Sequence, residues 1–303
     1  NSFCTLLEPK PGMLRATPGA RAKFRPFAGA LQTRFRWRHR EFDSWRRLMD
    51  ASCFLVDWIG RPRGDVLSVS GGHWSHIVTC AHVLAPWDYP NFYPPVGQTR
   101  FVSKITLADT MTQMRVPSLE GDPIYRHFCS QHHTFVHADK RLDLAVCHAE
   151  QFYKRNGESK LLFLQQEGLL MRPRIELLEE LEEGDIVWIY GCTARGDVYD
   201  DSEAADPMMV PTGIRCRVKH IDTDHFFLDT TADPMTNEVE MGMCGSVVIK
   251  GGKCVGMLTA TVHEDSENEK LRGTAMCTYA RDIRAFLLEV EQQMLNPPYL
   301  QEH

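Results

Sequence analysis

The spacing of short apolar runs constrains this chain more than any other feature. From about Ala51 onward, runs rich in Val, Ile, Phe and Thr recur at roughly regular intervals, separated by Gly, Pro, Asp or Asn. This pattern is typical of an all-β sandwich or barrel. It predicts strands at residues 53–59, 65–70, 76–79, 101–107, 113–116, 134–137, 142–147, 185–190, 212–220, 225–229, 246–250, 254–261 and 274–278. Thirteen strands are too many for one small sheet.

The C-terminal segment 282–294 has a different period. Its apolar residues recur at i, i+3, i+4 and i+7, and two consecutive prolines follow the segment; the residues are Ile283, Phe286, Leu287, Val290 and Met294. This spacing predicts an amphipathic helix that ends before the prolines and packs on the β body.

The first 40 residues are strongly basic. They hold nine Lys or Arg and a single acidic residue, Glu8, which gives these residues a net charge of +8. Because the whole chain has a net charge of −6, residues 41–303 have a net charge of −14. Aromatic residues are interleaved with the basic residues Arg21, Lys23, Arg25, Arg34, Arg36, Arg38 and Arg40. We predict a basic extended arm over residues 1–50, either a solvated leader or an arm whose guanidinium groups contact phosphates while its aromatics stack on bases.

Composition excludes several classes of protein. The chain has 303 residues, 43% of them hydrophobic and 24% charged, as in ordinary globular proteins. No apolar run approaches the roughly 18 residues of a membrane helix, so no membrane partner is expected. Ten cysteines without a CxxC pair predict an intracellular, reducing compartment. The Arg-rich, acid-poor start resembles the neighbourhood of an import signal, so we expect the mitochondrial matrix or the cytoplasm.

Three short motifs carry reactive side chains. They are VTCAHV at residues 78–83, LDLAV at 142–146 and MGMCGS at 241–246. The first places His82 at a strand end, and the second places Asp143 before an apolar run. The third places the thiol of Cys244 on a turn between two glycines, where a substrate carbonyl can approach and backbone N–H groups can converge on an oxyanion.

The chain order His, Asp, nucleophile among strands resembles the trypsin and chymotrypsin family of proteases. Residues 184–191 look like the strand that opens the second domain in HtrA-like members. Residues 251–257 look like the hairpin after the nucleophile, and residues 275–289 look like the closing strand and final helix. The resemblance covers about residues 51–291. It implies two packed antiparallel six-stranded β-barrels with a C-terminal helix.

The resemblance also implies roles for individual residues. His82 matches the general base, Asp143 the residue that orients it and Cys244 the nucleophile, with the N–H groups of Gly242 and Cys244 as the oxyanion hole. An imidazole beside a thiol stabilises the thiolate, which is the reactive form. Cysteine at this position is similar to the chymotrypsin-like processing proteases of positive-strand RNA viruses, whose nucleophile also lies in a Gly-x-Cys-Gly turn.

The nucleophile turn also departs from the family pattern. Met243 stands where an acid or Asn is usual, Ser246 replaces the usual second glycine, and Val247 stands where a proline is common. Met243 therefore excludes activation by pairing of a new N-terminus with an acid beside the nucleophile.

The resemblance implies a substrate-binding strand as well. Thr259, Ala260 and Thr261 match the strand that binds substrate backbone, and Glu238 near the base of the primary pocket would favour a basic side chain. We expect no cofactor and no metal, because the histidines and cysteine between residues 127 and 137 match no zinc-site spacing and are interpreted as a polar loop.

Two functions follow from these residues. The first is a peptidase that uses His82, Asp143 and Cys244 on a peptide or protein substrate. The second is a catalytically inactive trypsin-like domain, anchored through residues 1–50 to RNA or protein in a large assembly such as the mitochondrial ribosome. In both, the expected divisions are an arm at 1–50, a first barrel with its connector at 51–170, and a second barrel with the helix at 171–303.

Overall fold

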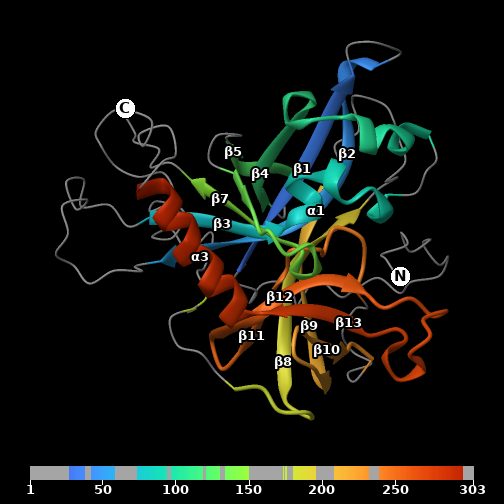
Figure 1. Cartoon of the computed structure of the whole chain (residues 1–303), viewed down its shortest axis with the longest axis vertical. Coiled ribbons are helices and arrows are strands. Elements are labelled where there is room, and N and C mark those ends of the chain that lie inside the picture. The colour runs from blue at the N-terminus through green and yellow to red at the C-terminus, as the bar shows by residue number, and fades with distance from the viewer. Residues whose placement is uncertain are drawn as a thin grey trace.

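The strands form two β units that follow one another along the chain (Figure 1). The computed structural model describes residues 27–37, 42–58, 74–93, 97–118, 121–129, 134–149, 173, 175, 180–195, 208–231 and 239–295. Every strand pairing in both units is antiparallel. The expected mostly β fold, with two barrel-like sheets and a C-terminal helix, is confirmed.

The first unit is a sheet with the order β5-β4-β1-β2-β3-β7-β6, seven strands in the part of the chain that the structure describes. Its strands are β1 (Ala28–Trp37), β2 (Phe42–Trp58), β3 (Trp74–Cys80), β4 (Thr110–Ser118), β5 (Gly121–Phe128), β6 (Thr134–Val136) and β7 (Leu144–Ala149). Inward side chains such as Leu31, Phe54 and Ile77 are fully buried. They form the core of this sheet.

The second unit is a closed six-stranded barrel with the order β10-β13-β12-β11-β8-β9. Its strands are β8 (Ile186–Arg195), β9 (Met208–Ile221), β10 (His225–Asp229), β11 (Val247–Lys250), β12 (Lys253–Thr261) and β13 (Ala275–Tyr279). Ile214, Phe226 and Leu258 belong to a separate core inside this barrel.

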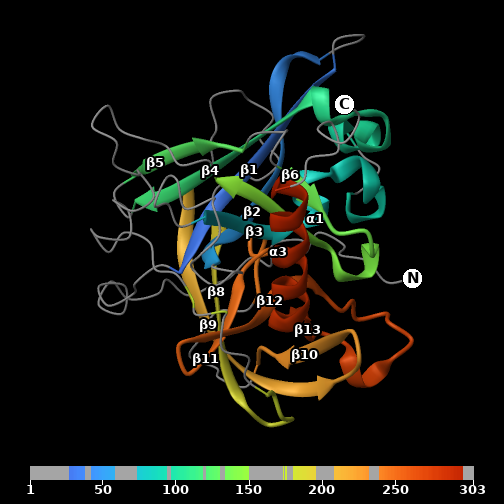
Figure 2. The same ribbon diagram turned by 60° about the vertical axis from the view of Figure 1, so that its left-hand side comes forward.

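The expected C-terminal helix is α3 (Ala280–Leu295), which runs across both units (Figure 2). It contacts β7 of the first sheet and β12 and β13 of the barrel. The predicted apolar face is buried at Ile283, Phe286, Leu287 and Val290. These side chains join the core of the first sheet, so the helix ties the two units together. Among the helices that the structure describes, none is long and apolar enough to cross a membrane.

The shorter helical elements lie mainly in the first unit. They are α1 (Ala81–Leu84) and the 3₁₀ segments Pro86–Asp88, Pro90–Phe92, Gly97–Lys104, Leu107–Asp109, Lys140–Leu142 and Glu269–Leu271. Gly97–Lys104 overlaps the strand predicted at 101–107, so that prediction is wrong. Phe101 and Val102 in this 3₁₀ segment, and Ile105 just after it, are buried. A short run of apolar residues fits a buried helical segment as well as a strand, so the sequence did not distinguish the two.

The prediction of an extended arm over residues 1–50 is wrong for residues 28–37 and 42–50, which are strands of the first sheet. β1 pairs with both β2 and β4. The alternation of basic and aromatic residues is the two-residue period of a strand, because Phe35 is buried while Arg36 lies 4.7 Å over the Trp45 ring. Arg34 donates to Gln32 Oε1 at 2.7 Å. The other predicted arm residues, Arg21, Lys23, Arg25, Arg38 and Arg40, lie outside the described residues.

Candidate active site

His82 lies just past the end of β3, as the second residue of α1. The strand-to-helix turn directs its imidazole toward Asp143, and the side chain has no exposed surface. A buried imidazole needs polar partners, because unsatisfied polar groups are costly away from water. The partner of its Nδ1 is a carboxylate.

Asp143 lies between the 3₁₀ turn Lys140–Leu142 and β7. Its backbone is left-handed, with φ 47° and ψ 46°, a conformation that Asp and Asn tolerate better than most residues. Its Oδ2 lies 2.6 Å from His82 Nδ1, and its Oδ1 accepts from the His82 backbone N–H at 2.9 Å. The two bonds fix both the position and the rotation of the imidazole, so Nδ1 is held as the protonated nitrogen.

The Cys244 turn packs against the first sheet. Gly242 and Gly245 have φ values of 92° and 87°, which glycine adopts without strain. The Cys244 carbonyl accepts from the Ser52 N–H at 2.8 Å. Ser52 O in turn accepts from Thr79 Oγ1 at 2.8 Å. The structure therefore brings the Cys244 turn against the strands that lead to His82, and the Cys244 side chain is half-buried.

Ser52 is a site residue that sequence reasoning missed. Its hydroxyl donates to the Gly242 carbonyl at 2.7 Å and accepts from the Cys192 N–H at 2.8 Å. These bonds fasten the turn to β2 and β8 together. The only sequence signal was one small polar residue within the apolar run Ala51-Ser52-Cys53-Phe54, and such a residue has many possible uses.

Ser246, which departs from the glycine usual in the resembled family, is accommodated by a glycine elsewhere. The Ser246 hydroxyl donates to the Met243 carbonyl at 2.5 Å. It occupies the space beside Gly191, where a Cβ would stand only 1.9 Å from Ser246 Oγ. The Ser246 side chain therefore fits only because residue 191 is a glycine.

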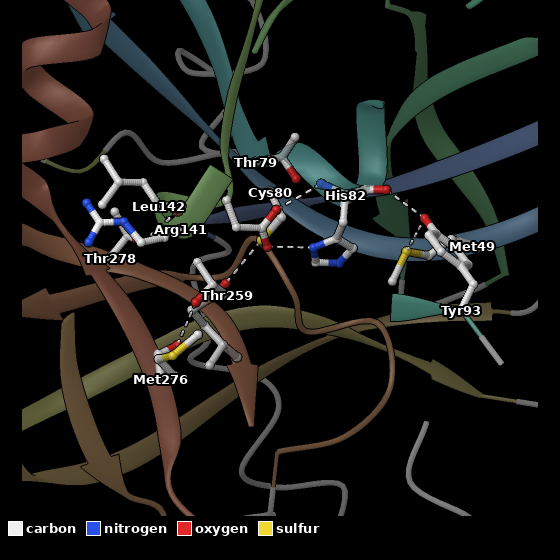
Figure 3. A network of polar contacts seen from close by, with 12 residues as sticks. Met49, Thr79, Cys80, His82, Tyr93, Arg141, Leu142, Thr259, Met276 and Thr278 are labelled. Atoms are coloured by element: carbon white, nitrogen blue, oxygen red, sulfur yellow. Dashed lines mark hydrogen bonds and ion pairs between the residues drawn. The ribbon is translucent and has the colours of Figure 1, made fainter. Parts of the chain in front are cut away.

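The strand expected to bind substrate backbone is β12. Thr259 is fully buried, and its hydroxyl donates to the Met276 carbonyl at 3.1 Å (Figure 3). The pairing of β12 with β13 shifts register between Leu258 and Ala260. Ala260 is 6% exposed and Thr261 is half-buried. Glu238 lies outside the described residues.

The segment after α1 covers His82. The Phe92 ring stacks on the imidazole with centroids 4.3 Å apart and an interplanar angle of 15°. The Tyr93 hydroxyl donates to the His82 carbonyl at 2.6 Å (Figure 3). Burial, and then the negative charge of Asp143, raise the pKa of Tyr93 well above its usual value, so this hydroxyl stays a donor.

The cysteines differ in accessibility. Among those that the structure describes, only Cys244 and Cys129 are half-buried, and the others are buried. Burial raises the pKa of Cys192 and Cys254 to about 12. A hydrogen bond with Cys147, followed by burial, raises the pKa of Cys129. These thiols are poor nucleophiles at neutral pH.

One group of side chains has the ligand types of a metal site. Ligand atoms of Cys80, His82 and Asp143 lie within 4.8 Å of one another, and all three residues are buried. A metal would have to displace the close contact between His82 and Asp143, and the Cys80 thiol already donates to the Leu258 carbonyl at 3.4 Å. The arrangement therefore favours a hydrogen-bonded pair over a metal centre.

Comparison with known proteins shows the fold alone. No family model and no curated protein sequence matches the chain. Among solved structures, human heparin binding protein matches with a TM-score of 0.50 and 11% identity, over 91% of this chain and 96% of that chain. A scabies mite inactivated protease paralogue, SMIPP-S-I1, matches with a TM-score of 0.49 and 12% identity, over 88% and 96%. The chain has a trypsin-like fold.

Proposed function

We propose that the protein is a peptidase of trypsin-like fold with Cys244 as nucleophile, His82 as general base and Asp143 as the residue that orients the base. The observation that carries this proposal is the double hydrogen bonding of Asp143 to the backbone and imidazole of His82. An aspartate that holds Nδ1 protonated leaves Nε2 as the nitrogen that takes a proton from a nucleophile.

The reaction uses side chains and backbone only. His82 Nε2 takes the thiol proton, and Cys244 Sγ attacks the peptide carbonyl carbon. The carbonyl oxygen becomes an oxyanion, toward which the N–H groups of Gly242 and Cys244 would donate. The C–N bond then breaks as His82 returns the proton to the leaving amine. Water attacks the resulting thioester, His82 takes a proton from the water, and the C–S bond breaks to release acid and regenerate the thiol.

The substrate of this reaction would be a peptide or protein. In the proposed complex its backbone pairs with residues 259–261 of β12, whose last member, Thr261, is half-buried. Glu238 would favour a basic side chain in the primary pocket, because opposite charges attract in a partly desolvated site.

The test is the rate of Cys244 alkylation as pH rises from about 4 to 9, with the modified residue identified by peptide mass mapping. A thiol paired with an imidazole reacts fast near pH 6, whereas a free thiol has a pKa of about 8.5. We expect fast labelling near pH 6 that slows markedly in His82→Ala. His263→Ala, a half-exposed histidine in the loop after β12, is the control and should keep the wild-type profile. Ordinary thiol behaviour in all three proteins would exclude the proposal.

A second candidate is a catalytically inactive trypsin-like domain within a larger assembly. The complete burial of His82 under Phe92 favours it, since a base without exposed surface cannot reach a substrate. The proposed partner, RNA or protein, would contact residues 1–26 of the predicted arm, since residues 28–37 and 42–50 are strands, in the mitochondrial matrix or the cytoplasm. This candidate predicts that Cys244 reacts as an ordinary thiol, or not at all, with or without His82.

A further inference from the structure

Residues 86–93 form a stiff segment directly after α1. It consists of two 3₁₀ turns, Pro86–Asp88 and Pro90–Phe92, each of which begins with a proline. Proline fixes φ near −65°, so each turn keeps its shape when it moves. The segment ends at Tyr93, whose side chain is buried.

The inner side of the segment covers the imidazole with aromatic rings. Phe92 lies nearly parallel to His82 at 4.3 Å, and Tyr89 packs edge-on against Phe92 at 5.9 Å with an angle of 77°. Phe92 itself is only half-buried, while His82 has no exposed surface. The Phe92 ring therefore lies between the imidazole and the outside.

The two ends of the segment are fastened differently. At its base, the Tyr93 hydroxyl donates to the His82 carbonyl at 2.6 Å and to Met49 Sδ at 3.3 Å. At its outer side, Lys140 Nζ lies 3.2 Å from Asp88 Oδ1, in an ion pair whose side chains are 63% and 43% exposed. Exposed pairs of this kind contribute little to stability, so the middle of the segment is held mainly by the Tyr89 ring, which packs in the core of the first sheet.

The closed position leaves one polar group unsatisfied. Tyr89 is 6% exposed, and its hydroxyl oxygen is buried without a hydrogen-bond partner among the residues that the structure describes. A buried hydroxyl without a partner costs free energy that water would return if the segment lifted. Hydration of this hydroxyl would therefore offset part of the cost of removing the Tyr89 ring from the core when the segment opens.

We propose that residues 86–92 form an autoinhibitory lid that pivots at Tyr93 and must lift Phe92 from His82 before peptide is cleaved. This inference rests on the proposed function, because His82 must give a proton to the leaving amine and therefore has to contact the substrate. The lid also reconciles an assembled His82–Asp143 pair with an imidazole that is buried: the base is oriented in the closed state and becomes accessible in the open one.

The test separates uncovering of His82 from reaction at Cys244. Carbethoxylation of His82 by diethyl pyrocarbonate, followed by peptide mass mapping, measures access to the imidazole independently of any activity. A peptidyl vinyl sulfone that alkylates Cys244 measures productive peptide binding. The variants are Phe92→Ala, the exposed control Asn91→Ala in the same turn, and Phe92→Ala combined with His82→Ala.

For wild type, we expect slow but complete carbethoxylation of His82, as local opening allows. Phe92→Ala should raise that rate and the rate of Cys244 alkylation by at least about tenfold, whereas Asn91→Ala should stay within about twofold of wild type. Addition of His82→Ala should remove the gain at Cys244. An unreactive His82 in wild type even after long exposure would mean a fixed cover and would overturn the lid.

Equal carbethoxylation of wild type and Phe92→Ala would also overturn the lid, and would leave the peptidase proposal intact if Cys244 alkylation still depends on His82. If Phe92→Ala uncovers His82 but the rate of Cys244 alkylation is the same with and without His82→Ala, the peptidase proposal fails. The autoinhibition proposal then fails with it. The two failures therefore have different signatures.

Discussion

At the scale of single residues, the site depends on backbone conformations that few side chains adopt. Asp143 is the one non-glycine residue with positive φ in the described part of the chain, and Gly242 and Gly245 carry the turn around Cys244. Asp143 bonds to His82, whereas the Gly242 carbonyl accepts from the Ser52 hydroxyl and the Gly245 N–H donates to the Leu258 carbonyl. Substitutions at these positions distinguish a loss of stability through backbone strain from a loss of the proposed reaction.

Asp143→Asn should abolish reaction while the fold survives. Asn tolerates left-handed backbone, and its amide oxygen can still accept from the His82 N–H, but its NH₂ would then face Nδ1 and impose the wrong tautomer. We expect peptide hydrolysis to fall by about 10³–10⁴-fold, with only a small change in melting temperature. Asp265→Asn, at the exposed pair with His263, is the control. Unchanged hydrolysis in Asp143→Asn would remove Asp143 from the mechanism.

Gly245→Ala should destabilise the protein severely. A Cβ at this position would lie 2.1 Å from Ser52 O and 2.6 Å from Thr79 Oγ1, so backbone must move. The expected loss in the free energy of unfolding is at least about 3 kcal/mol. Gly252→Ala has a similar φ of 83° with nothing within 4 Å, and should cost only about 1–2 kcal/mol. Urea unfolding of both variants checks this, and equal losses would exclude crowding as the cause.

At the scale of elements, contacts between neighbouring strands and between helix and sheet decide stability. β8 and β11 pair with Ile189 opposite Val248, and Gly191 of β8 faces the Ser246 side chain just before β11. α3 packs its apolar face on the first sheet. Both contacts hold elements that carry the Cys244 turn or link it to the first unit.

The Gly191 and Ser246 pair should be energetically coupled. Gly191→Ala alone places a Cβ on Ser246 Oγ and should cost about 1–3 kcal/mol. Ser246→Gly alone loses the bond to the Met243 carbonyl, about 1 kcal/mol. In the double variant the clash with Ser246 is absent and only the 3.0 Å approach to Ser52 Oγ remains, so the total loss should be smaller than the sum by about 1–3 kcal/mol. A double-mutant cycle from urea unfolding measures this coupling, and additive losses would contradict it.

Two adjacent leucines of α3 should behave oppositely. Leu287 has no exposed surface, whereas Leu288 is 38% exposed. Leu287→Ala removes buried methyl groups and leaves a cavity, at a cost of about 2–5 kcal/mol, and Leu288→Ala should stay within about 0.5 kcal/mol of wild type. Thermal unfolding compares the two. Similar effects would mean that α3 does not pack through the predicted face.

At the scale of the whole molecule, the second barrel fixes the loop that carries Asp143. Arg141 pairs with Asp139 on its own loop and, at 2.8 Å, with Asp224 in the turn between β9 and β10. The Leu142 carbonyl accepts from Thr278 Oγ1 of β13 at 2.8 Å (Figure 3). The orientation of His82 therefore depends on residues of both units.

The contact that Arg141 makes between the two units should weaken in acid, because Asp139, which holds Arg141, becomes protonated. Hydrogen bonds from the Arg141 side chain and backbone lower the pKa of Asp139 to about 2, against about 3.9 in the unfolded chain. A lowered folded-state pKa contributes stability that is present above pH about 4 and lost as pH falls through about 2. Wild type should exceed Asp139→Asn in stability at pH 6, and the difference should shrink between about pH 4 and 2. A difference that stays constant in urea unfolding would contradict this.

Strand and helix periods, which are written within a few positions, predict a mostly β chain and its C-terminal helix. The candidates His82, Asp143 and Cys244 come from three short motifs, and their roles come from the resemblance to the trypsin family. Local patterns did not indicate that residues 28–37 and 42–50 are strands, because basic residues alternating with aromatics also fit an arm until β4 and the rest of β2 are there to pair with them.

Contacts between groups far apart in the sequence depend on how the strands and helices pack. Ser52 and Gly242, which are joined by a hydrogen bond, lie 190 residues apart, and no local period encodes such a pairing. The same holds for Phe92 on His82: the aromatic and proline-rich segment was visible in the sequence, but its place over the imidazole depends on how α1 leaves β3 and on the Tyr93 anchor. Side chains find such partners only after strand pairing and packing set the distances between elements.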